Sequence, residues 1–233
     1  MKVGIIQSNF LPWRGYFDFI REVDLFILED DLQYTKGDWR NRNRIKTPRG
    51  SEWITVPVNY KRTEQLIEET SIDYSTPWAR KMLNRIRESY RTAPCFEPYF
   101  SELSDTLLKP FASISELNVS LIHWVCRRLE IGTPITFSRE YHPSGTKTER
   151  VISILRQVDA DTYLSGPSGK NYIVPELFEQ AGIRLEYKEY NYPEYEQLYP
   201  PFDPSVSVLD LLFMKGADAK FYLEFSREKQ DDQ

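Results

Sequence analysis

The densest group of side chains able to bind an anion lies in a basic segment of the N-terminal third of the chain. Between Lys36 and Arg49 stand six basic residues and one acid, Asp38, which gives the segment a charge of +5 in a chain of net charge −5. Arginine binds phosphate or carboxylate through two parallel hydrogen bonds. Alternating arginine and asparagine in an extended segment would lie on opposite faces.

The segment therefore predicts a cationic site for a small molecule, in which the basic residues hold a phosphate and the asparagines read sugar hydroxyls or a base. The alternative is a solvated basic hairpin. The predicted binding residues here are Trp39, Arg40, Asn41, Arg42, Asn43 and Lys46.

A second group of polar and aromatic side chains follows the first predicted strand, Lys2–Gln7, at its turn into a short helix. In open α/β sheets, ligands bind beyond the carboxyl ends of the strands, where this turn commonly supplies donors. A tight structural turn with aromatic packing is the alternative. The predicted substrate-binding residues of the turn are Gln7, Asn9, Trp13, Arg14 and Tyr16.

Three other polar residues are candidates for catalysis. Asp31 and Gln33 follow the second predicted strand, where a carboxylate serves either as a general base or as a counter-ion for the arginines. His142 precedes a proline in a loop, a position that leaves a catalytic role open. The acid pair at 30–31 is a weak Mg²⁺ signal without further ligands, and the two cysteines match no metal spacing. The sequence predicts no metal site.

A glycine-containing turn late in the chain is a third candidate for phosphate binding. Ser165 and Gly166 end a predicted strand, and Lys170 follows shortly after them. This chemistry suits phosphate oxygens, although the spacing is not that of a P-loop because Gly166 and Gly169 are only three apart. A plain strand-to-helix turn is the alternative.

The elements that must position these groups alternate between strands and helices, which predicts an α/β fold with a mostly parallel sheet flanked by helices. An all-helical middle, about 76–131, reads as an insertion or lid within a single domain of residues 1–225, followed by a polar tail at 226–233. The predicted strands are Lys2–Gln7, Leu25–Leu28, Trp53–Val58, Ser71–Tyr74, Ile135–Ser138, Thr162–Ser165 and Arg184–Tyr190. The predicted helices are Tyr16–Val23, 77–92, 97–111, 115–130, Thr146–Val158, Val174–Ala181 and Val206–Met214.

Composition limits the classes of function. The 233 residues, 40% of them hydrophobic and 14% aromatic, are enough for a full core. No apolar run has the roughly 18 residues that a membrane helix needs, and the start of the chain reads as a strand, so we expect a cytoplasmic protein. The net negative charge makes nucleic acid an unlikely partner. The sequence leaves a homodimer open.

Several of these motifs, in this order, resemble the WbqC-like protein family. The chain departs from the family pattern at Ile6 and Ser8, where histidine and proline are common, and this weakens any catalytic role for the first turn. The matching segments are Gln7–Phe19, Asp31–Tyr34, Trp39–Asn43, Ile45–Lys46, Trp53–Val58, Tyr163–Gly166, Ser207–Met214 and Gly216.

The resemblance implies a role in the synthesis of bacterial surface polysaccharides such as O-antigen, acting on a nucleotide-linked amino sugar. The leading hypothesis is an N-acyltransferase in which Arg40, Arg42 and Lys46 hold the diphosphate. Asp31 then orients or deprotonates the attacking amine. The cofactor is open between acyl-CoA and ATP with Mg²⁺. The second hypothesis is an ATP-dependent adenylate-forming ligase or a nucleotidyltransferase-like enzyme, although the turn at 12–16 lacks the histidine of such folds. The third is a non-enzymatic binder of RNA or of a partner through the basic segment.

Overall fold

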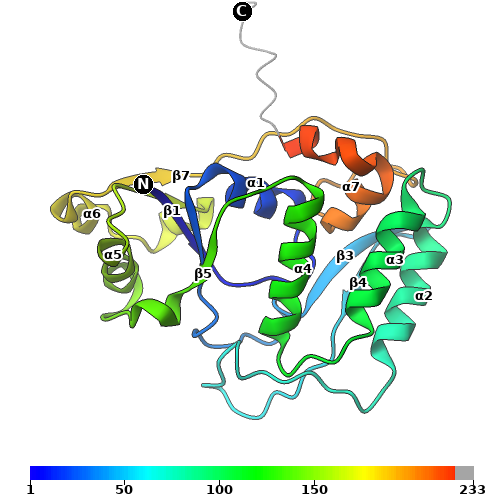
Figure 1. Ribbon diagram of the computed structural model, residues 1–233, viewed down its shortest axis with the longest axis horizontal. Helices are drawn as coiled ribbons and strands as arrows, with labels where there is room; N and C mark the ends of the chain where they lie inside the picture. The colour runs from blue at the N-terminus through cyan, green and yellow to red at the C-terminus, as the bar shows by residue number, and fades with distance from the viewer. Residues whose placement is uncertain (224–233) are drawn as a thin grey trace, which may run out of the picture.

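The computed structural model describes residues 1–223 and contains a five-stranded parallel sheet near the centre of the molecule (Figure 1). The order along the sheet is β5-β2-β1-β6-β7, and each neighbouring pair is parallel. The predicted α/β fold with a mostly parallel sheet is confirmed. The strands are β1 (Lys2–Ile6), β2 (Leu25–Leu28), β5 (Ile135–Phe137), β6 (Thr162–Ser165) and β7 (Arg184–Tyr187).

The central strands β1 and β2 are buried on both faces, which explains why they read as nearly continuous apolar runs. Val3 and Ile5 of β1 pack into one hydrophobic cluster with helices α5 (Lys147–Gln157) and α6 (Pro175–Ala181). The other face packs against α1 (Arg14–Glu22). A side chain at Gly4 would lie 2.3 Å from the Phe19 ring, so only glycine lets this helix approach the strand.

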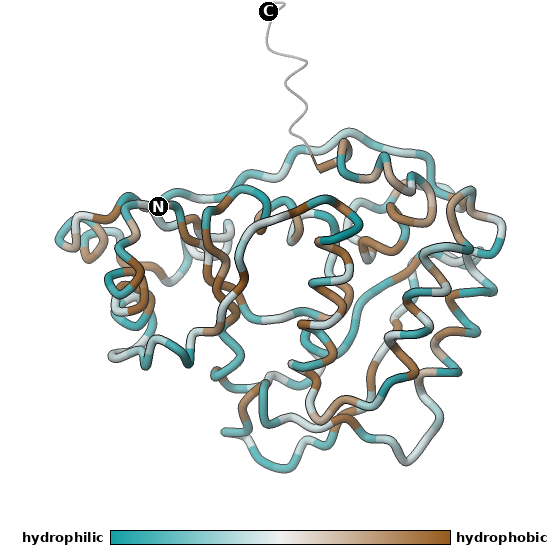
Figure 2. Tube along the Cα trace, in the orientation of Figure 1, coloured by the Kyte–Doolittle hydropathy of each residue, from teal (hydrophilic) through white to brown (hydrophobic). Residues whose placement is uncertain are grey.

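The helical middle follows the strands β3 (Arg42–Thr47) and β4 (Gly50–Thr55) and precedes β5. It comprises α2 (Trp78–Tyr90), α3 (Phe96–Leu107) and α4 (Ile114–Arg128), close to the predicted ranges. Brown and teal alternate along these helices, as expected for amphipathic elements (Figure 2). Their apolar faces join α7 (Val208–Lys215) and the α1 side of the sheet in one hydrophobic cluster. The insertion is thus packed into the main core.

Two sequence predictions in the first half of the chain are wrong. The polar composition of residues 36–49 predicts a loop, but Arg42–Thr47 forms β3 and pairs antiparallel with β4. Its inward residues include Asn43 and Ile45, whereas arginines point outward, so the strand lacks an apolar pattern. Ser71–Tyr74 contains only isolated β-bridges, at Ser71 and Ile72. The predicted polar tail at 226–233 lies outside the described residues.

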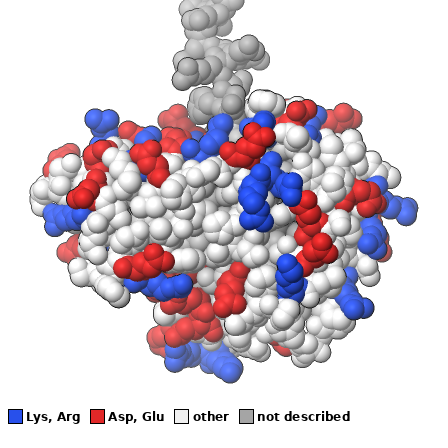
Figure 3. All heavy atoms as spheres, in the orientation of Figure 1, with Lys and Arg blue, Asp and Glu red and all other residues white. Residues whose placement is uncertain are grey.

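Short 3₁₀ helices complete the fold at 138–141, 167–171 and 216–223. Among residues 1–223, no helix is both long and apolar enough to span a bilayer. Acidic and basic side chains are interspersed over the face shown in Figure 3.

Candidate functional site

The strand order reverses at β1, because β2 lies on one side of it and β6 on the other. Open parallel sheets bind ligands beyond the carboxyl ends of their strands at such a switch point. The turn that leaves β1 begins with Gln7, Ser8 and Asn9, so their side chains lie beside this edge. The topology therefore places the first predicted group of binding residues where the fold class most often has its site.

Arg40 joins the basic segment to this turn. Its guanidinium donates hydrogen bonds to the side-chain oxygens of Asn9 and Gln7. Arg40 precedes β3, so it does not share a strand face with Arg42 as the alternation predicted. Only 12% of its side chain is exposed, and the nearest carboxylate, Asp38, is 3.5 Å away. Burial lowers the pKa of the Arg40 guanidinium, and the negative charge of Asp38 opposes that shift.

A buried network holds Arg40 and the turn in place. Asn118 of α4 donates to the backbone carbonyl of Arg40 at 2.8 Å and to the hydroxyl of Ser8 at 3.1 Å. The Asp30 carboxylate accepts from the Ser8 backbone N–H at 2.7 Å and from the Ser115 hydroxyl at 2.5 Å. Because these groups are almost fully buried, the position of the Arg40 segment is fixed before any ligand arrives.

A pocket of about 280 Å³ opens beside this turn. Two indole rings, Trp13 and Trp39, form part of its wall, and Trp39 is 40% exposed. The Trp13 ring lies across Gly15, where an added side chain would come within 2.3 Å of it. Flat aromatic surfaces beside amide groups are typical of sugar or base binding. The lining residues are Asn9, Pro12, Trp13, Trp39, Asn43 and Ser205.

An aromatic and cationic surface continues outward from the pocket. The rings of Trp39 and Trp53 lie 5.4 Å apart, and the Arg42 guanidinium lies 4.2 Å from the centre of the Trp53 ring. Arg44 donates to the hydroxyl of Ser205, which lines the pocket, at 2.6 Å. Within residues 1–223, Arg42 has no carboxylate partner, so its charge is available to an anion.

Two asparagines of the basic segment support the backbone with their amide nitrogens. Asn41 donates to the Val56 carbonyl at 2.8 Å, and Asn43 donates to the Leu11 carbonyl at 2.8 Å and to the Phe10 carbonyl at 3.2 Å. Leu11 has a φ of +43°, so Asn43 stabilises a strained turn. Asn43 also lines the pocket, whereas Asn41 does not.

Three other predicted binding residues are largely buried in the protein. Lys46 donates to the Pro201 carbonyl at 2.5 Å and is 2% exposed. Arg14 donates to the Pro193 carbonyl at 2.9 Å and lies over the Tyr192 ring. Tyr16 donates to the Gln7 carbonyl at 3.0 Å. These contacts fix the three side chains within the protein around the pocket, and none of the three lines the pocket.

The predicted acid Asp31 belongs to a different cluster at the same edge of the sheet. Its two carboxylate oxygens accept from the Ser138 hydroxyl and, at 2.7 Å, from Arg150. Arg150 also donates to Glu29 at 2.8 Å. Burial raises the pKa of the Glu29 carboxyl, and its hydrogen bond with Arg150 opposes that shift.

The remaining predicted residues lie outside the pocket wall. Gln33 is exposed and forms a β-bridge with Leu66, and His142 is exposed with a left-handed backbone, φ +43°. Catalytic roles for Asp31, Gln33 and His142 stay predictions.

The turn after β6 is more open than the turn after β1. The Ser165 side chain is buried against Gly169, where an added side chain would come within 2.2 Å of its hydroxyl. Gly166 faces open space, and the Lys170 ammonium lies 5.2 Å from the centre of the Tyr187 ring. Gly166 and Lys170 therefore stay candidates for a phosphate contact, whereas the buried Ser165 hydroxyl donates to the Gly166 carbonyl at 3.1 Å. None of the three lines the tryptophan pocket.

Four residues of the site were missed by the sequence reasoning. Pro12 and Ser205 line the pocket, Asp38 lies beside Arg40, and Asn118 holds the Arg40 backbone. The sequence does single out Asp38, because it is the only acidic residue between Lys36 and Arg49. Asn118 and Ser205 had no such signal, because they reach the site only through long-range packing.

Comparison with known proteins gives a family and one close relative but no described activity. The chain is 44% identical to the uncharacterized protein Rv1507c of Mycobacterium tuberculosis over 234 residues, which is 97% of this chain and 99% of the relative. No solved structure matches the chain. The profile of the WbqC-like protein family matches residues 7–222, which include the turn after β1, the basic segment and the Ser165-Gly166 turn. The chain therefore belongs to the WbqC-like protein family.

Proposed function

We propose that this protein is an enzyme of bacterial surface-polysaccharide synthesis that binds a nucleotide-linked amino sugar in the tryptophan pocket. One observation carries the proposal. The almost buried Arg40 guanidinium makes its hydrogen bonds to two neutral amide side chains, Gln7 and Asn9, beside a pocket walled by Trp13 and Trp39. Such an arginine, already desolvated and held, binds a phosphate strongly because little order is lost on binding.

The proposed ligand extends from the pocket onto the hairpin. A volume of about 280 Å³ suits one sugar or base ring between the indoles. The diphosphate then lies along the arginines, with Arg40 at the pocket and Arg42 and Arg44 on the outer surface. Neutral amide and hydroxyl groups from Asn9 and Ser205 contact the ring hydroxyls.

The proposed reaction is transfer of an acyl group from a thioester to the amine of the sugar. The amine nitrogen attacks the thioester carbonyl, a C–N bond forms as the C–S bond breaks, and the proton lost by nitrogen ends on the leaving thiol. The amine must be unprotonated to attack. We assign the acceptor of a hydrogen bond from this amine to Asp38, whose carboxylate lies 3.5 Å from the Arg40 guanidinium.

A thermal-shift screen with UDP- and dTDP-linked amino sugars tests the binding, and release of free thiol from an acyl-CoA tests the reaction. A ligand at about a hundred times its Kd adds about 2.7 kcal/mol of stability. Stabilisation by a nucleotide sugar and thiol release that requires the sugar are the expected results. A protein that no nucleotide sugar stabilises would rule the proposal out.

A second candidate is ATP-dependent adenylation of an acid, and the open turn after β6 favours it. Gly166 is unobstructed at the switch point, where a nucleotide phosphate would approach the backbone. Release of pyrophosphate that requires ATP, Mg²⁺ and an acid would make this the leading function. If the protein releases no pyrophosphate but still binds a nucleotide sugar, the adenylation function is ruled out.

A further inference from the structure

A second cavity, of about 500 Å³, lies between strand β4 and the first turns of α2. Its walls combine two indoles with apolar and basic side chains, and no acidic residue lines it. Trp53 and Thr55 alternate with buried Ile54 on β4 and so face outward side by side. The lining residues are Trp53, Ile54, Thr55, Pro57, Thr76, Trp78, Lys81, Met82 and Arg85.

The two basic residues of this groove differ in their partners. Arg85 is ion-paired with Glu52 and donates to the Trp53 carbonyl at 3.1 Å. Lys81 is exposed and has no ion-pair partner among residues 1–223. The groove thus offers one unpaired cation, and the positive lining favours an anionic ligand.

The groove connects to the tryptophan pocket through a pair of rings. Trp39 lines the pocket, Trp53 lines the groove, and their ring centres are 5.4 Å apart. A ligand in the groove and a ligand in the pocket would therefore approach each other at this pair. A group-transfer enzyme needs its two substrates in such contact.

We propose that the groove between β4 and α2 binds the acyl donor, as a coenzyme A thioester. The adenine base stacks on Trp53, Lys81 binds a phosphate, and the pantetheine arm runs along the apolar wall of Ile54, Pro57 and Met82. This assignment rests on the proposed acyl transfer in naming the donor. The binding itself is independent of the sugar.

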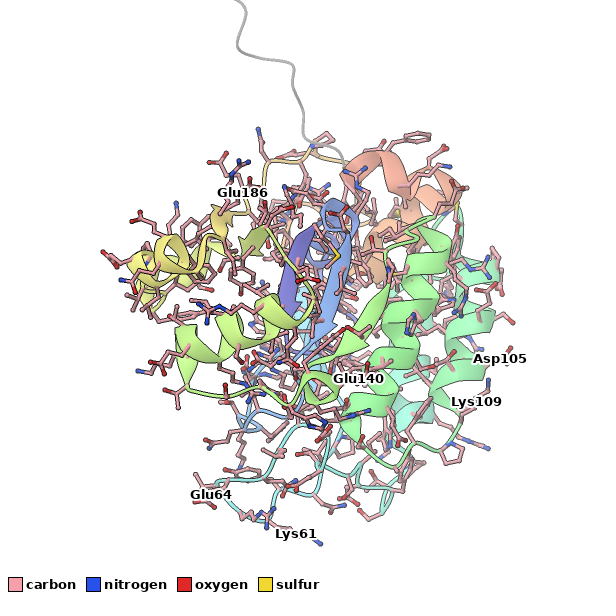
Figure 4. All side chains as sticks on the ribbon, turned by 60° about the vertical axis from the view of Figure 1, so that its left-hand side comes forward. Lys61, Glu64, Asp105, Lys109, Glu140 and Glu186 are labelled. Carbon is pink, nitrogen blue, oxygen red and sulfur yellow. The ribbon has the colours of Figure 1, made fainter. Side chains whose placement is uncertain are left out.

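Isothermal titration of the protein with coenzyme A, in the absence of any sugar, tests the assignment. We expect Lys81→Ala to weaken binding about tenfold, because a charge-assisted hydrogen bond is lost. Trp53→Ala weakens it by a similar factor, because the base loses its stacking surface. The matched control is Lys61→Ala, since Lys61 lies on the loop after β4 and points away from the body of the molecule (Figure 4).

The outcomes separate this assignment from the proposed function. Coenzyme A binding that is weakened by Lys81→Ala and not by Lys61→Ala supports the groove, whether or not a nucleotide sugar binds. If the wild-type protein binds a nucleotide sugar but not coenzyme A, the assignment of coenzyme A to the groove is wrong. The proposed nucleotide-sugar site is then still supported. If maltotetraose competes with coenzyme A and its own binding is insensitive to Lys81→Ala, the groove binds a glycan. That result would also overturn the assignment of coenzyme A.

Discussion

Two arginines lie at the same carboxyl edge of the sheet and differ in what surrounds them. Arg40 donates to the neutral amides of Gln7 and Asn9, with Asp38 only at 3.5 Å. Arg150 donates to two carboxylates, Glu29 and Asp31, at 2.8 and 2.7 Å.

The difference separates the arginine that we propose to bind an anion from an arginine with a structural role. Two carboxylates more than neutralise Arg150, so an anionic ligand would be repelled there. Arg40 has a single carboxylate neighbour, Asp38 at 3.5 Å, so its charge is not outweighed in this way. Charge alone therefore does not identify an anion site, and the partners of each arginine decide its use.

The largest expected effect is on stability, from Arg150→Met. The substitution leaves Glu29 and Asp31 as neighbouring carboxylates, 12% and 16% exposed, without their cation. Losing one partner of a buried ion pair costs about 3–5 kcal/mol, and we expect the free energy of unfolding to fall by about that amount. Urea denaturation measures it. A variant as stable as the wild type would show that this cluster contributes no structural support.

The next effect is on affinity, from Trp39→Ala. A stacked ring contributes about 1–3 kcal/mol to binding, so we expect the affinity for a UDP-linked amino sugar to fall at least fivefold. Because Trp39 is 40% exposed, stability should change little. Trp39→Phe, which keeps a ring, is the matched control. An unchanged affinity in Trp39→Ala would place the sugar elsewhere.

Salt should separate the ligand contact from the ion pairs of Arg150. The proposed diphosphate lies partly along the outer arginines, of which Arg44 is 29% exposed, so its binding is screened and we expect Kd to rise several-fold between about 50 and 500 mM NaCl. The ion pairs of Arg150 are mostly buried and screened much less. Titration calorimetry at each salt concentration measures the first effect. Binding that does not respond to salt would argue against a phosphate contact.

The smallest effect concerns pH and Glu29. Burial raises the pKa of its carboxyl above the ordinary 4.5, so the folded state binds the proton more tightly than the unfolded state. The free energy of unfolding therefore falls as pH rises from 4.5 through the folded pKa. We expect Glu29→Gln to remove this slope, as measured by denaturation at a series of pH values. A slope unchanged in the variant would assign the pH dependence to other groups.

The sequence predicted the sheet well and the site only in part. Leu25–Leu28 is a continuous apolar run that is almost fully buried, so its pattern identifies it as a strand of the sheet. The strand Arg42–Thr47 was missed because its outward positions are basic.

The site depends on contacts that no local pattern records. Arg40 turns back to residues about thirty positions earlier, and Asn118 reaches it from a helix far along the chain. Composition predicted a cationic site. Only the fold separates Arg40, which is bonded to the turn beside the pocket, from Lys46 and Arg14, which are buried in the surrounding protein.

The most direct test of the central claim is calorimetric titration of Arg40→Gln with a UDP-linked amino sugar. Arg49→Gln is the matched control, because Arg49 belongs to the same basic segment but is 80% exposed and ion-paired with Glu52. We expect Arg40→Gln to weaken binding at least tenfold, from the loss of a charge-assisted contact of about 1.5–3 kcal/mol, and Arg49→Gln to have little effect. Equal affinity in the wild type and in Arg40→Gln would contradict the account.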